Sequence, residues 1–490
     1  YLERMDTAIA VEEACRFSEW SFSARGNAYT TAADLSRSHP VITAVDAGNL
    51  VARYQKLPGW IDGEIANLRS GLQQGMAANR ISVEKVIAMV DAELAASPEN
   101  QSLLEPARVE HPDIAPAQLG SFQANLSQAV HGGVRPALTR YRDFLKQEVL
   151  PQARGEGREG LTGIALGQAC YAARVRQETT TTRSPEEIHQ QGLDELDRIH
   201  AEMIELGGKV LGISSIEALF KQLRTDPKLH FSTRAEVEQT AESALRRAEA
   251  AVPSVFGRLP KAACEVRPIP DHEAPYTTIA YYWPAVPDGG APGIYYVNSY
   301  QPESRTRFDA EVLAFHEAVP GHHFQFAISQ ELPEMPLFRR HADFTVFVEG
   351  WALYTERLAG EMGLYSGDLD RIGMLGFDSW RAARLVVDTG IHAMGWSRGE
   401  AEEFMRLNTP LAENNIVNEV DRYVTWPGQA LAYKTGQLEI LRMRREAEAG
   451  LGTRFELSGF HDTLLGGGAL PLGLLERRVK AWVESKQRGG

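Results

Sequence analysis

The residues best suited to chemistry lie in one short segment, 316–323, which reads His-Glu-Ala-Val-Pro-Gly-His-His. It follows the apolar-rich stretch 308–315, which we expect to be a helix that runs into His316. A histidine beside a glutamate on a helix, with a further histidine shortly after, is the element of a zinc hydrolase. One imidazole would bind the metal. Glu317 would take a proton from a metal-bound water, whose pKa zinc lowers towards ~7.

The spacing of these histidines differs from that of a straight metal-binding helix. His322 lies six residues after His316, about 240° round a regular helix, whereas His323 lies ~10 Å along its axis. Pro320 would break such a helix because its ring clashes with the carbonyl of His316, and Gly321 tolerates unusual backbone angles. We therefore expect a kink or bulge that returns the second histidine towards the first. Spacing alone leaves both later histidines open as the second ligand.

His316-Glu317 followed by Gly321-His322 resembles the bacterial family catalogued as domain of unknown function 885. That family is similar to helical zinc peptidases of the gluzincin type, such as angiotensin-converting enzyme, the thimet-like oligopeptidases and the thermostable carboxypeptidases. Those enzymes carry His-Glu-x-Gly-His, and alignment on Gly-His favours His322 over His323 as the second ligand. The resemblance covers most of the chain. It implies a largely helical, two-lobed domain whose helices enclose the active site and admit only short, unfolded peptides.

A gluzincin needs a glutamate on a later helix as its third ligand. Glu349 fits this role, because it lies 27 residues after His322 in an apolar stretch, and a buried carboxylate needs a cation. Glu356 lies seven residues further on and on the same helical face, where it could orient a metal-binding histidine. Related enzymes often place that second acid four residues after the ligand, where this chain has Leu353.

Two further segments could complete an active site. Hydrolysis through a tetrahedral intermediate needs a donor aimed at the developing oxyanion, and the candidates are Tyr433, Tyr423 and His392. Arg384 or Lys434 could hold the carboxylate at the end of a substrate, the arginine through two hydrogen bonds. The alternative for both cations is an ordinary solvated position or one at the rim of the core.

The elements that must position these residues are mostly helices. Apolar periodicity predicts helical structure over 61–96, 184–203, 235–250, 306–319, 342–360, 371–394, 399–407, 429–449 and 471–485. Ser184 and Glu187 form a predicted capping box around a proline in the first turn of one of these helices.

One proline-rich, aromatic region at 263–300 departs from this pattern. The runs 279–283 and 293–298 flank Pro287-Asp288-Gly289-Gly290, which predicts a β-hairpin. In peptidases of the gluzincin type, an edge strand before the metal helix pairs with the substrate backbone. Tyr282 would then lie near the substrate, although packing in a core is the commoner role of such aromatic residues.

Composition limits the partners of the chain. Its 490 residues include 51 Lys and Arg against 65 Asp and Glu, a net charge of −14, which argues against nucleic acid and anionic membrane surfaces as partners. No run reaches the ~18 apolar residues of a membrane-spanning helix.

The cysteines bear on the compartment. Cys15, Cys170 and Cys264 are far apart and form no CxxC motif. We therefore expect no disulfide framework, and this weakly favours the cytoplasm. The chain opens on Tyr1, which is compatible with a removed signal peptide.

Together these patterns predict a mainly α-helical, two-lobed protein with a small β-sheet beside a deep cleft. We expect one catalytic domain over 1–490, with a helical lobe over 1–262, a β region over 263–300 and metal-site helices over 301–490. The expected function is zinc-dependent hydrolysis of short peptides. A carboxypeptidase or a dipeptidase-type exopeptidase is one option, and the sequence leaves open whether cleavage releases one residue, a dipeptide or an internal fragment. The alternatives are a peptide-binding module with a vestigial metal site and a metal hydrolase of non-peptide amides.

Overall fold

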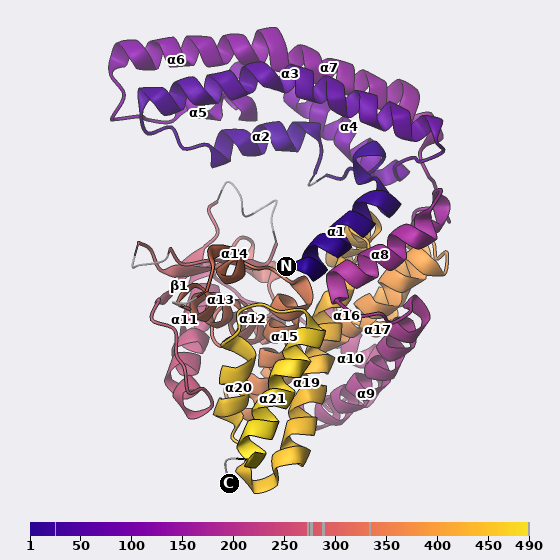
Figure 1. Ribbon diagram of the computed structural model, residues 1–490, viewed down its shortest axis with the longest axis vertical. Coiled ribbons are helices and arrows are strands. Elements are labelled where there is room, and N and C mark those ends of the chain that lie inside the picture. The colour runs from indigo at the N-terminus through magenta and orange to yellow at the C-terminus, as the bar shows by residue number, and fades with distance from the viewer. Residues whose placement is uncertain (25, 272–273, 275–277, 287–289, 333–334, 489–490) are drawn as a thin grey trace. The chain divides into compact units, whose positions relative to one another are not determined.

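A computed structural model describes the chain except for residues 25, 272–273, 275–277, 287–289, 333–334 and 489–490 (Figure 1). The protein is mainly helical with a small three-stranded mixed sheet, as the sequence predicts. The chain divides into two compact units. The smaller unit comprises residues 8–171 and 391–398, and the larger unit comprises residues 1–7, 172–390 and 399–490. One catalytic domain over the whole chain stays a prediction.

The smaller unit is a helical assembly around the long helix α3, which packs against α6 and α7. Its core is aliphatic and aromatic, with Leu50, Tyr54 and Ile61 of α3 wholly buried. The stretch 61–96 is helical over 61–73 and 80–95. Gly75 lies in the connection between these helices, where its φ of 74° suits a residue without Cβ. Its elements are most of α1 (Leu2–Cys15), α2 (Ala28–Ser38), α3 (Ala44–Gln73), α4 (Arg80–Ala95), α5 (Glu105–Arg108), α6 (Pro116–Ala129), α7 (Arg135–Phe144) and the start of α8 (Gly167–Thr179).

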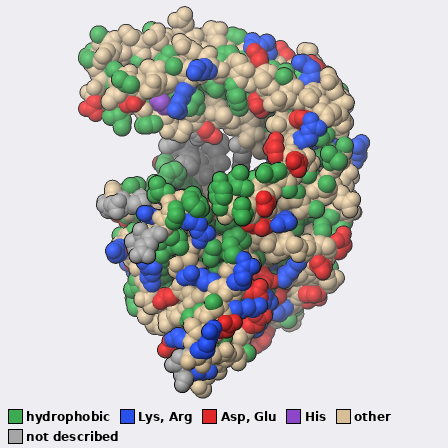
Figure 2. Space-filling view, in the orientation of Figure 1, with side chains coloured by type: hydrophobic (Ala, Val, Ile, Leu, Met, Phe, Trp, Pro, Cys, Tyr) green, Lys and Arg blue, Asp and Glu red, His purple; other side chains and the backbone are tan. Residues whose placement is uncertain are grey.

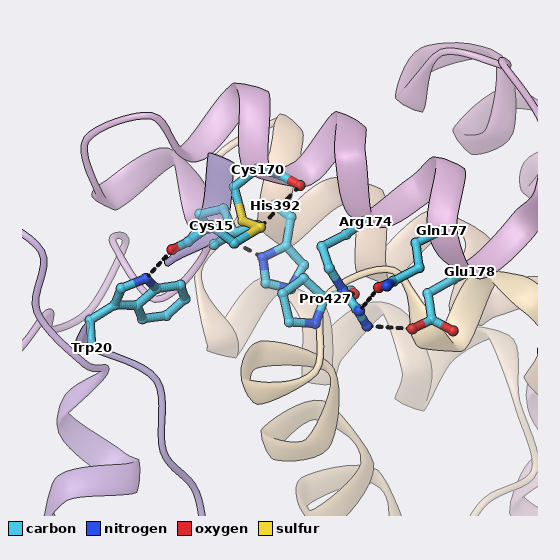
Figure 3. Close-up of a disulfide and its surroundings, with 9 residues drawn as sticks. Cys15, Trp20, Cys170, Arg174, Gln177, Glu178, His392 and Pro427 are labelled. Atoms are coloured by element: carbon cyan, nitrogen blue, oxygen red, sulfur yellow. Dashed lines mark hydrogen bonds and ion pairs between the residues drawn. A yellow bond between two sulfur atoms is a disulfide. The ribbon is translucent and has the colours of Figure 1, made fainter. Parts of the chain in front are cut away.

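A disulfide joins Cys15, at the end of α1, to Cys170 in α8 (Figure 3). The expectation of no disulfide was therefore wrong. The two cysteines are 155 residues apart in sequence, and folding brings their Cα atoms to 4.6 Å. Trp20 donates a hydrogen bond to the Cys15 carbonyl at 2.8 Å. The remaining cysteine, Cys264, is buried and free, and burial raises its pKa to about 12, so it behaves as an apolar core residue.

The larger unit holds most of the predicted helices. Ser184 and Glu187 form the predicted capping box at the start of α9, with hydrogen bonds of 3.2 and 2.8 Å. The helices are α9 (Pro185–Leu211), α10 (Ile216–Thr225), α11 (Arg234–Ala251), α12 (Ala310–Glu317), α13 (His322–Gln330), α14 (Leu337–Arg340), α15 (Thr345–Glu361), most of α16 (Asp368–Ala393), α17 (Arg398–Asn408), α18 (Glu413–Thr425), α19 (Ala432–Leu451), α20 (Leu457–Leu465) and α21 (Leu472–Arg488).

The sheet of the larger unit has the strand order β1-β3-β2, with β1 at Cys264–Pro268, β2 at Ala280–Trp283 and β3 at Gly293–Val297. The predicted antiparallel pairing of β2 with β3 is confirmed, with Tyr282 opposite Tyr295. Its predicted turn lies mostly outside the described residues. Strand β1 adds a parallel pairing with β3 that the hairpin pattern did not predict.

Helix α15 is held in place by a close crossing with α19 (Figure 1). Gly350 faces Gly436, and a Cβ on Gly350 would lie 2.5 Å from the Gly436 Cα. Glycine at both positions allows the two helix backbones to touch, because a side chain on either residue would clash with the other helix. The crossing therefore fixes the position of α15 next to Glu349, the residue directly before Gly350.

Charges on the larger unit are mixed in sign. Figure 2 shows basic and acidic side chains interspersed over α19, α20 and α21 at the lower end of the view. Arg442 pairs with Glu439 and Glu446 of its own helix, and Arg444 pairs with Glu361. These arginines do not form the uninterrupted basic stripe typical of a nucleic-acid surface. None of the described helices combines the length and apolar character of a membrane span.

Candidate metal centre

The predicted break in the metal-bearing helix is present. Helix α12 ends at Glu317 and α13 begins at His322. Between them, Ala318 leaves helical geometry at φ −104° and ψ −105°, and Gly321 adopts φ −76° and ψ −129°. Pro320 cannot donate the backbone hydrogen bond that would continue the helix.

Two features hold the chain tightly at this break. A Cβ on Gly321 would lie 1.8 Å from the His316 carbonyl oxygen, so only glycine allows this close approach. From α15, Trp351 donates its indole N–H to the Pro320 carbonyl at 2.9 Å, and Thr355 donates to the Phe315 carbonyl at 3.2 Å. Helix α15 therefore satisfies carbonyls that the break releases, and it fixes the position of the two histidines.

His316, His322 and Glu349 come together at this point. The Glu349 Oε2 lies 3.6 Å from the His316 Nε2 and 3.5 Å from the His322 Nε2. One potential ligand atom from each residue lies within 4.8 Å of the other two. Ligands about 2.0–2.1 Å from a tetrahedral zinc ion lie about 3.3 Å from one another. The observed separations thus suit ligands of one ion, and they exceed the usual length of a direct hydrogen bond.

The electrostatics of the cluster also suit a cation. The Glu349 Oε2 is buried and has no hydrogen-bond partner among the described residues. Burial raises the pKa of Glu349, but the neighbouring His316 and His322 outweigh burial and hold that pKa well below its ordinary value. The carboxylate is therefore ionised, and a buried carboxylate without a partner is costly unless a cation joins it.

Glu356 lies behind the first histidine, at the place where an orienting acid is expected. Its Oε1 is 2.8 Å from the His316 Nδ1, and the carboxylate is wholly buried one side chain away from the cluster. Because the carboxylate accepts the Nδ1 proton, the Nε2 of His316 presents its lone pair to a metal. The seven-residue spacing from Glu349 to Glu356 therefore permits the contact expected of an orienting acid.

Glu317 ends α12 directly beside His316. Among the described residues, its carboxylate has no hydrogen-bond or ion-pair partner. Burial, and secondarily the charge of Glu317, raises the pKa of Tyr295, so the carboxylate lies near that phenol of β3. A carboxylate without a partner next to a metal site is available as a base.

His323 does not join the cluster. Its Nε2 lies 3.0 Å from the Ala262 carbonyl oxygen, which can only accept, so Nε2 carries the proton. Its Nδ1 then accepts from the Tyr282 hydroxyl at 3.0 Å. Burial lowers the pKa of His323 to about 4, and the ring is neutral with both nitrogens used. The geometry therefore favours His322 as the second ligand, and it places Tyr282 against His323.

The predicted residues Arg384, Tyr423 and Tyr433 form a second group in the larger unit. The Nε of Arg384 donates to the Tyr423 hydroxyl at 2.9 Å, and the guanidinium lies 4.5 Å from the Tyr433 ring centroid. The Tyr433 hydroxyl lies 3.3 Å from the Arg422 Nη2 and 3.4 Å from the Gln429 Nε2.

Lys434 is placed differently from what a substrate-binding role requires. Its ammonium group is fully buried and lies 2.8 Å from Asp378, 3.0 Å from Glu195 and 2.8 Å from the Gln437 side-chain oxygen. Three acceptors for three N–H bonds leave no donor for a ligand. These contacts describe a structural ion pair in the core.

His392 belongs to the smaller unit, unlike the other predicted site residues. Its Nδ1 accepts a hydrogen bond from the Leu161 backbone N–H at 3.2 Å, and its ring packs on Tyr171 at 5.3 Å between centroids. Because Nδ1 accepts this hydrogen bond, it carries no proton and cannot donate to an oxyanion.

Sequence reasoning missed Arg381 and Arg422. Arg381 lies one turn before Arg384 on α16, and its Nη2 is 3.8 Å from the Glu356 Oε1. Arg422 immediately precedes Tyr423 on α18. The available signal was spacing, because residues three apart on a helix share a face.

A cavity of about 110 Å³ lies along one face of α12. Ala310 and Leu313 line it, and Glu317 follows them on the same helical face. Trp380 of α16 and Tyr295 of β3 contribute to the opposite walls. Neither Glu317 nor the three residues of the metal cluster belong to its described lining.

Comparisons with known proteins agree on a family without an assigned function. The family described as "Bacterial protein of unknown function (DUF885)" matches residues 2–479. The structure of a candidate lipoprotein from Colwellia psychrerythraea is 30% identical with a TM-score of 0.86, over 92% of this chain and 78% of that one. A second candidate lipoprotein of unknown function, from Shewanella oneidensis, shares the fold at 19% identity and a TM-score of 0.74, over 97% of this chain and 85% of its own. No curated protein matches.

Proposed function

The chain belongs to the bacterial family of unknown function 885, and for this member we propose the activity of a zinc-dependent peptidase that cleaves short peptides. The observation that supports this most strongly is the convergence of His316, His322 and Glu349, with Glu317 beside them. Two imidazoles and one carboxylate are the ligand set of catalytic zinc sites that keep a fourth position open. Bound there, zinc supplies a water of lowered pKa and polarises the scissile carbonyl.

The chain's own residues then have separate tasks. Glu356 holds His316 in the tautomer whose Nε2 is free to bind. Glu317 takes the proton that the attacking water gives up and returns it to the leaving amine. A metal of purely structural use needs no such base, and this favours an enzyme over a peptide-binding module.

Tyr433 is the best placed of the three candidate oxyanion donors. Its hydroxyl accepts from Arg422 and Gln429, so its own hydrogen stays available for donation. The Tyr423 hydroxyl already receives hydrogen bonds from Arg384 and Trp380. Against the effect of burial, Arg384, Arg422 and, to a smaller extent, a hydrogen bond from Tyr423 lower the pKa of Glu419, so the Tyr423 proton is also in use. We assign the stabilisation of the oxyanion to Tyr433.

We also propose that the protein works outside the cytoplasm, in place of the cytoplasmic location that the sequence weakly favoured. The disulfide between Cys15 and Cys170 is of a kind that persists in oxidising compartments. The related protein from Colwellia psychrerythraea is described as a candidate lipoprotein, which supports the same proposal.

The decisive experiment separates the base from the metal. In Glu317→Gln, we expect about one zinc per chain to remain, while kcat falls by about 10²- to 10⁴-fold because no group takes the proton. Zinc content is measured by metal analysis and activity with a panel of two- to five-residue peptides. The exposed Glu303→Gln serves as the matched control and should keep both zinc and activity.

Two outcomes would contradict the proposal. One is full peptidase activity in zinc-loaded Glu317→Gln. The other is a zinc-loaded wild-type chain that cleaves no peptide of the panel. Cleavage of acyl-amides but not peptides would instead identify a hydrolase of non-peptide amides.

A further inference from the structure

Three arginines of the larger unit lie together with N–H groups that have no acceptor among the described residues. These groups are the Nε and Nη1 of Arg381, the Nη1 of Arg384 and the Nε of Arg422. Arg381 and Arg384 are only 4% and 2% exposed, and the Arg422 side chain is 17% exposed. Buried guanidinium groups normally find partners for these donors, so this arginine cluster is arranged to meet an additional acceptor.

The acids around the arginine cluster do not balance its charge. Glu419 lies 2.9 Å from the Arg384 Nη2 and 3.5 Å from the Arg422 Nη1, so it serves two arginines at once. Glu356 lies 3.8 Å from the Arg381 Nη2, but its nearest oxygen is already committed to His316 at 2.8 Å. Among the described residues, the ion pairs of the three arginines are therefore made with only two carboxylates, Glu419 and Glu356, which leaves room for a further anion.

Aromatic rings hold two of the guanidinium groups without using their donors. Both Arg381 and Arg384 lie 4.3 Å from the centroid of the Trp380 ring, and Arg384 lies 4.5 Å from that of Tyr433. Stacking fixes the plane of a guanidinium while its N–H groups stay free at the edge. Such an edge matches the two oxygens of a carboxylate.

The arginine cluster adjoins the metal centre on one side and the surface on the other. Glu356 contacts both His316 and Arg381, so only one side chain separates the cluster from a metal ligand. At the opposite side, Arg422 packs against Trp426, which is exposed. A peptide could therefore reach the cluster with its end while its last bonds lie near the metal ligands.

We propose that Arg381, Arg384 and Arg422 bind the free α-carboxylate of the substrate, which makes the protein an exopeptidase acting at the carboxyl end of short peptides. The inference rests on the proposed peptidase function. It assigns the recognition of the carboxylate to three arginines, and it excludes Lys434, whose donors are used within the core.

Matched peptides test the proposal with the zinc-loaded full chain. Each peptide is supplied as the free acid, as the C-terminal amide, and as an amide that carries a glutamate side chain. We expect kcat/KM to be about 100-fold higher for the acid than for either amide, because charge-assisted hydrogen bonds are lost. The glutamate-containing amide distinguishes a terminal carboxylate from an acidic side chain.

Variants then locate the effect. Arg422→Gln and Arg381→Lys should each raise KM for the acid about 10- to 100-fold, and this rise should exceed any change in KM for the amide. Arg371→Gln is the matched control, because Arg371 lies on the same helix α16 but is exposed and pairs with Asp368. Its kinetics should equal those of the wild type.

A binding measurement keeps this inference separate from the proposed function. Isothermal titration calorimetry with N-acetyl-dialanine and its amide measures binding without turnover. We expect the wild type to bind the acid but not the amide, and we expect Arg422→Gln to lose the binding of the acid. Equal binding of acid and amide, or equal cleavage of both, would overturn the carboxylate assignment. Binding of the acid without any cleavage would overturn the peptidase function and leave the arginine site standing.

Discussion

Two places in the larger unit bury imidazole rings, yet they have opposite chemistry. At the metal centre, His316 lies against Glu356 and Glu349. In the core beneath α20, His461 lies between the Tyr354 hydroxyl and the Val255 carbonyl, each 2.8 Å from a ring nitrogen. Both rings are almost inaccessible to solvent. The difference lies in the partners, which are charged in one place and neutral in the other.

The partners decide the affinity of each ring for a cation. Burial lowers the pKa of both histidines, but Glu349 and Glu356 outweigh burial at His316 and raise its pKa to about 9. At His461 the Val255 carbonyl offsets little of the effect of burial, and the pKa falls to about 3. A site that attracts a proton this strongly is also one where a metal ion can replace that proton. Burial alone therefore does not identify a metal ligand.

The largest expected effect is on zinc content. His316→Ala and Glu349→Ala should each abolish stoichiometric zinc binding, because either change removes a ligand from a set of three. His323→Asn and His461→Gln should retain about one zinc per chain, since these rings are used in neutral hydrogen bonds. Metal analysis after dialysis against dilute zinc measures all four. Loss of zinc in His323→Asn but not in a His322→Ala variant would reverse the ligand assignment.

The features of the fold and of the metal centre that the sequence could predict are local ones. Pro320 and Gly321 predicted the end of α12 because proline acts on the turn that contains it. The capping box at Ser184 is likewise complete within four residues. Glu349 could be proposed because an apolar helix that carries an acid is visible in the sequence.

What the sequence could not predict depends on contacts between distant segments. Cys15 and Cys170 meet only because α1 and α8 pack together within the fold. Arg381 and Arg422 gain their roles from the side chains around them, among them Trp380 and Tyr433, and no local pattern separates these arginines from the many that pair on a helix surface. For the same reason, spacing alone could not decide whether His322 or His323 is the second ligand, because the answer depends on the distant residues that each ring contacts.

A smaller effect on metal affinity is expected from the acid behind the first ligand. Glu356→Gln keeps the size of the side chain but removes the charge that holds the Nδ1 proton of His316. We expect zinc affinity to fall about 10- to 100-fold, less than on removal of a ligand. Competition with a chelator of known affinity gives the dissociation constant. Glu361→Gln on the same helix is the control, because Glu361 pairs with Arg444 at the surface and should leave that constant unchanged. An unchanged constant in Glu356→Gln would show that the carboxylate only fills space.

A pH-dependent effect on stability is expected from the neutral histidine. His461 stays uncharged in the folded protein down to about pH 3, whereas an unfolded histidine takes up a proton near pH 6.5. The unfolded state therefore binds more protons below pH 6.5, and the free energy of unfolding should fall by roughly 1.4 kcal/mol per pH unit between about pH 6.5 and pH 3 from this residue alone. In His461→Gln this contribution is absent, so its stability should depend less steeply on pH, although the variant starts from a lower stability.

Urea unfolding followed by circular dichroism at pH 7.5, 5.5 and 4.5 measures this difference. A chelator in every sample removes any contribution from metal release by His316 and His322. His341→Gln is the control, because His341 is exposed and its loss should leave the slope unchanged. Parallel pH dependences for wild type and His461→Gln would mean that the buried ring does become protonated. The claim that His461 stays neutral in the folded protein would then be wrong, whereas the assignment of the metal centre would be unaffected.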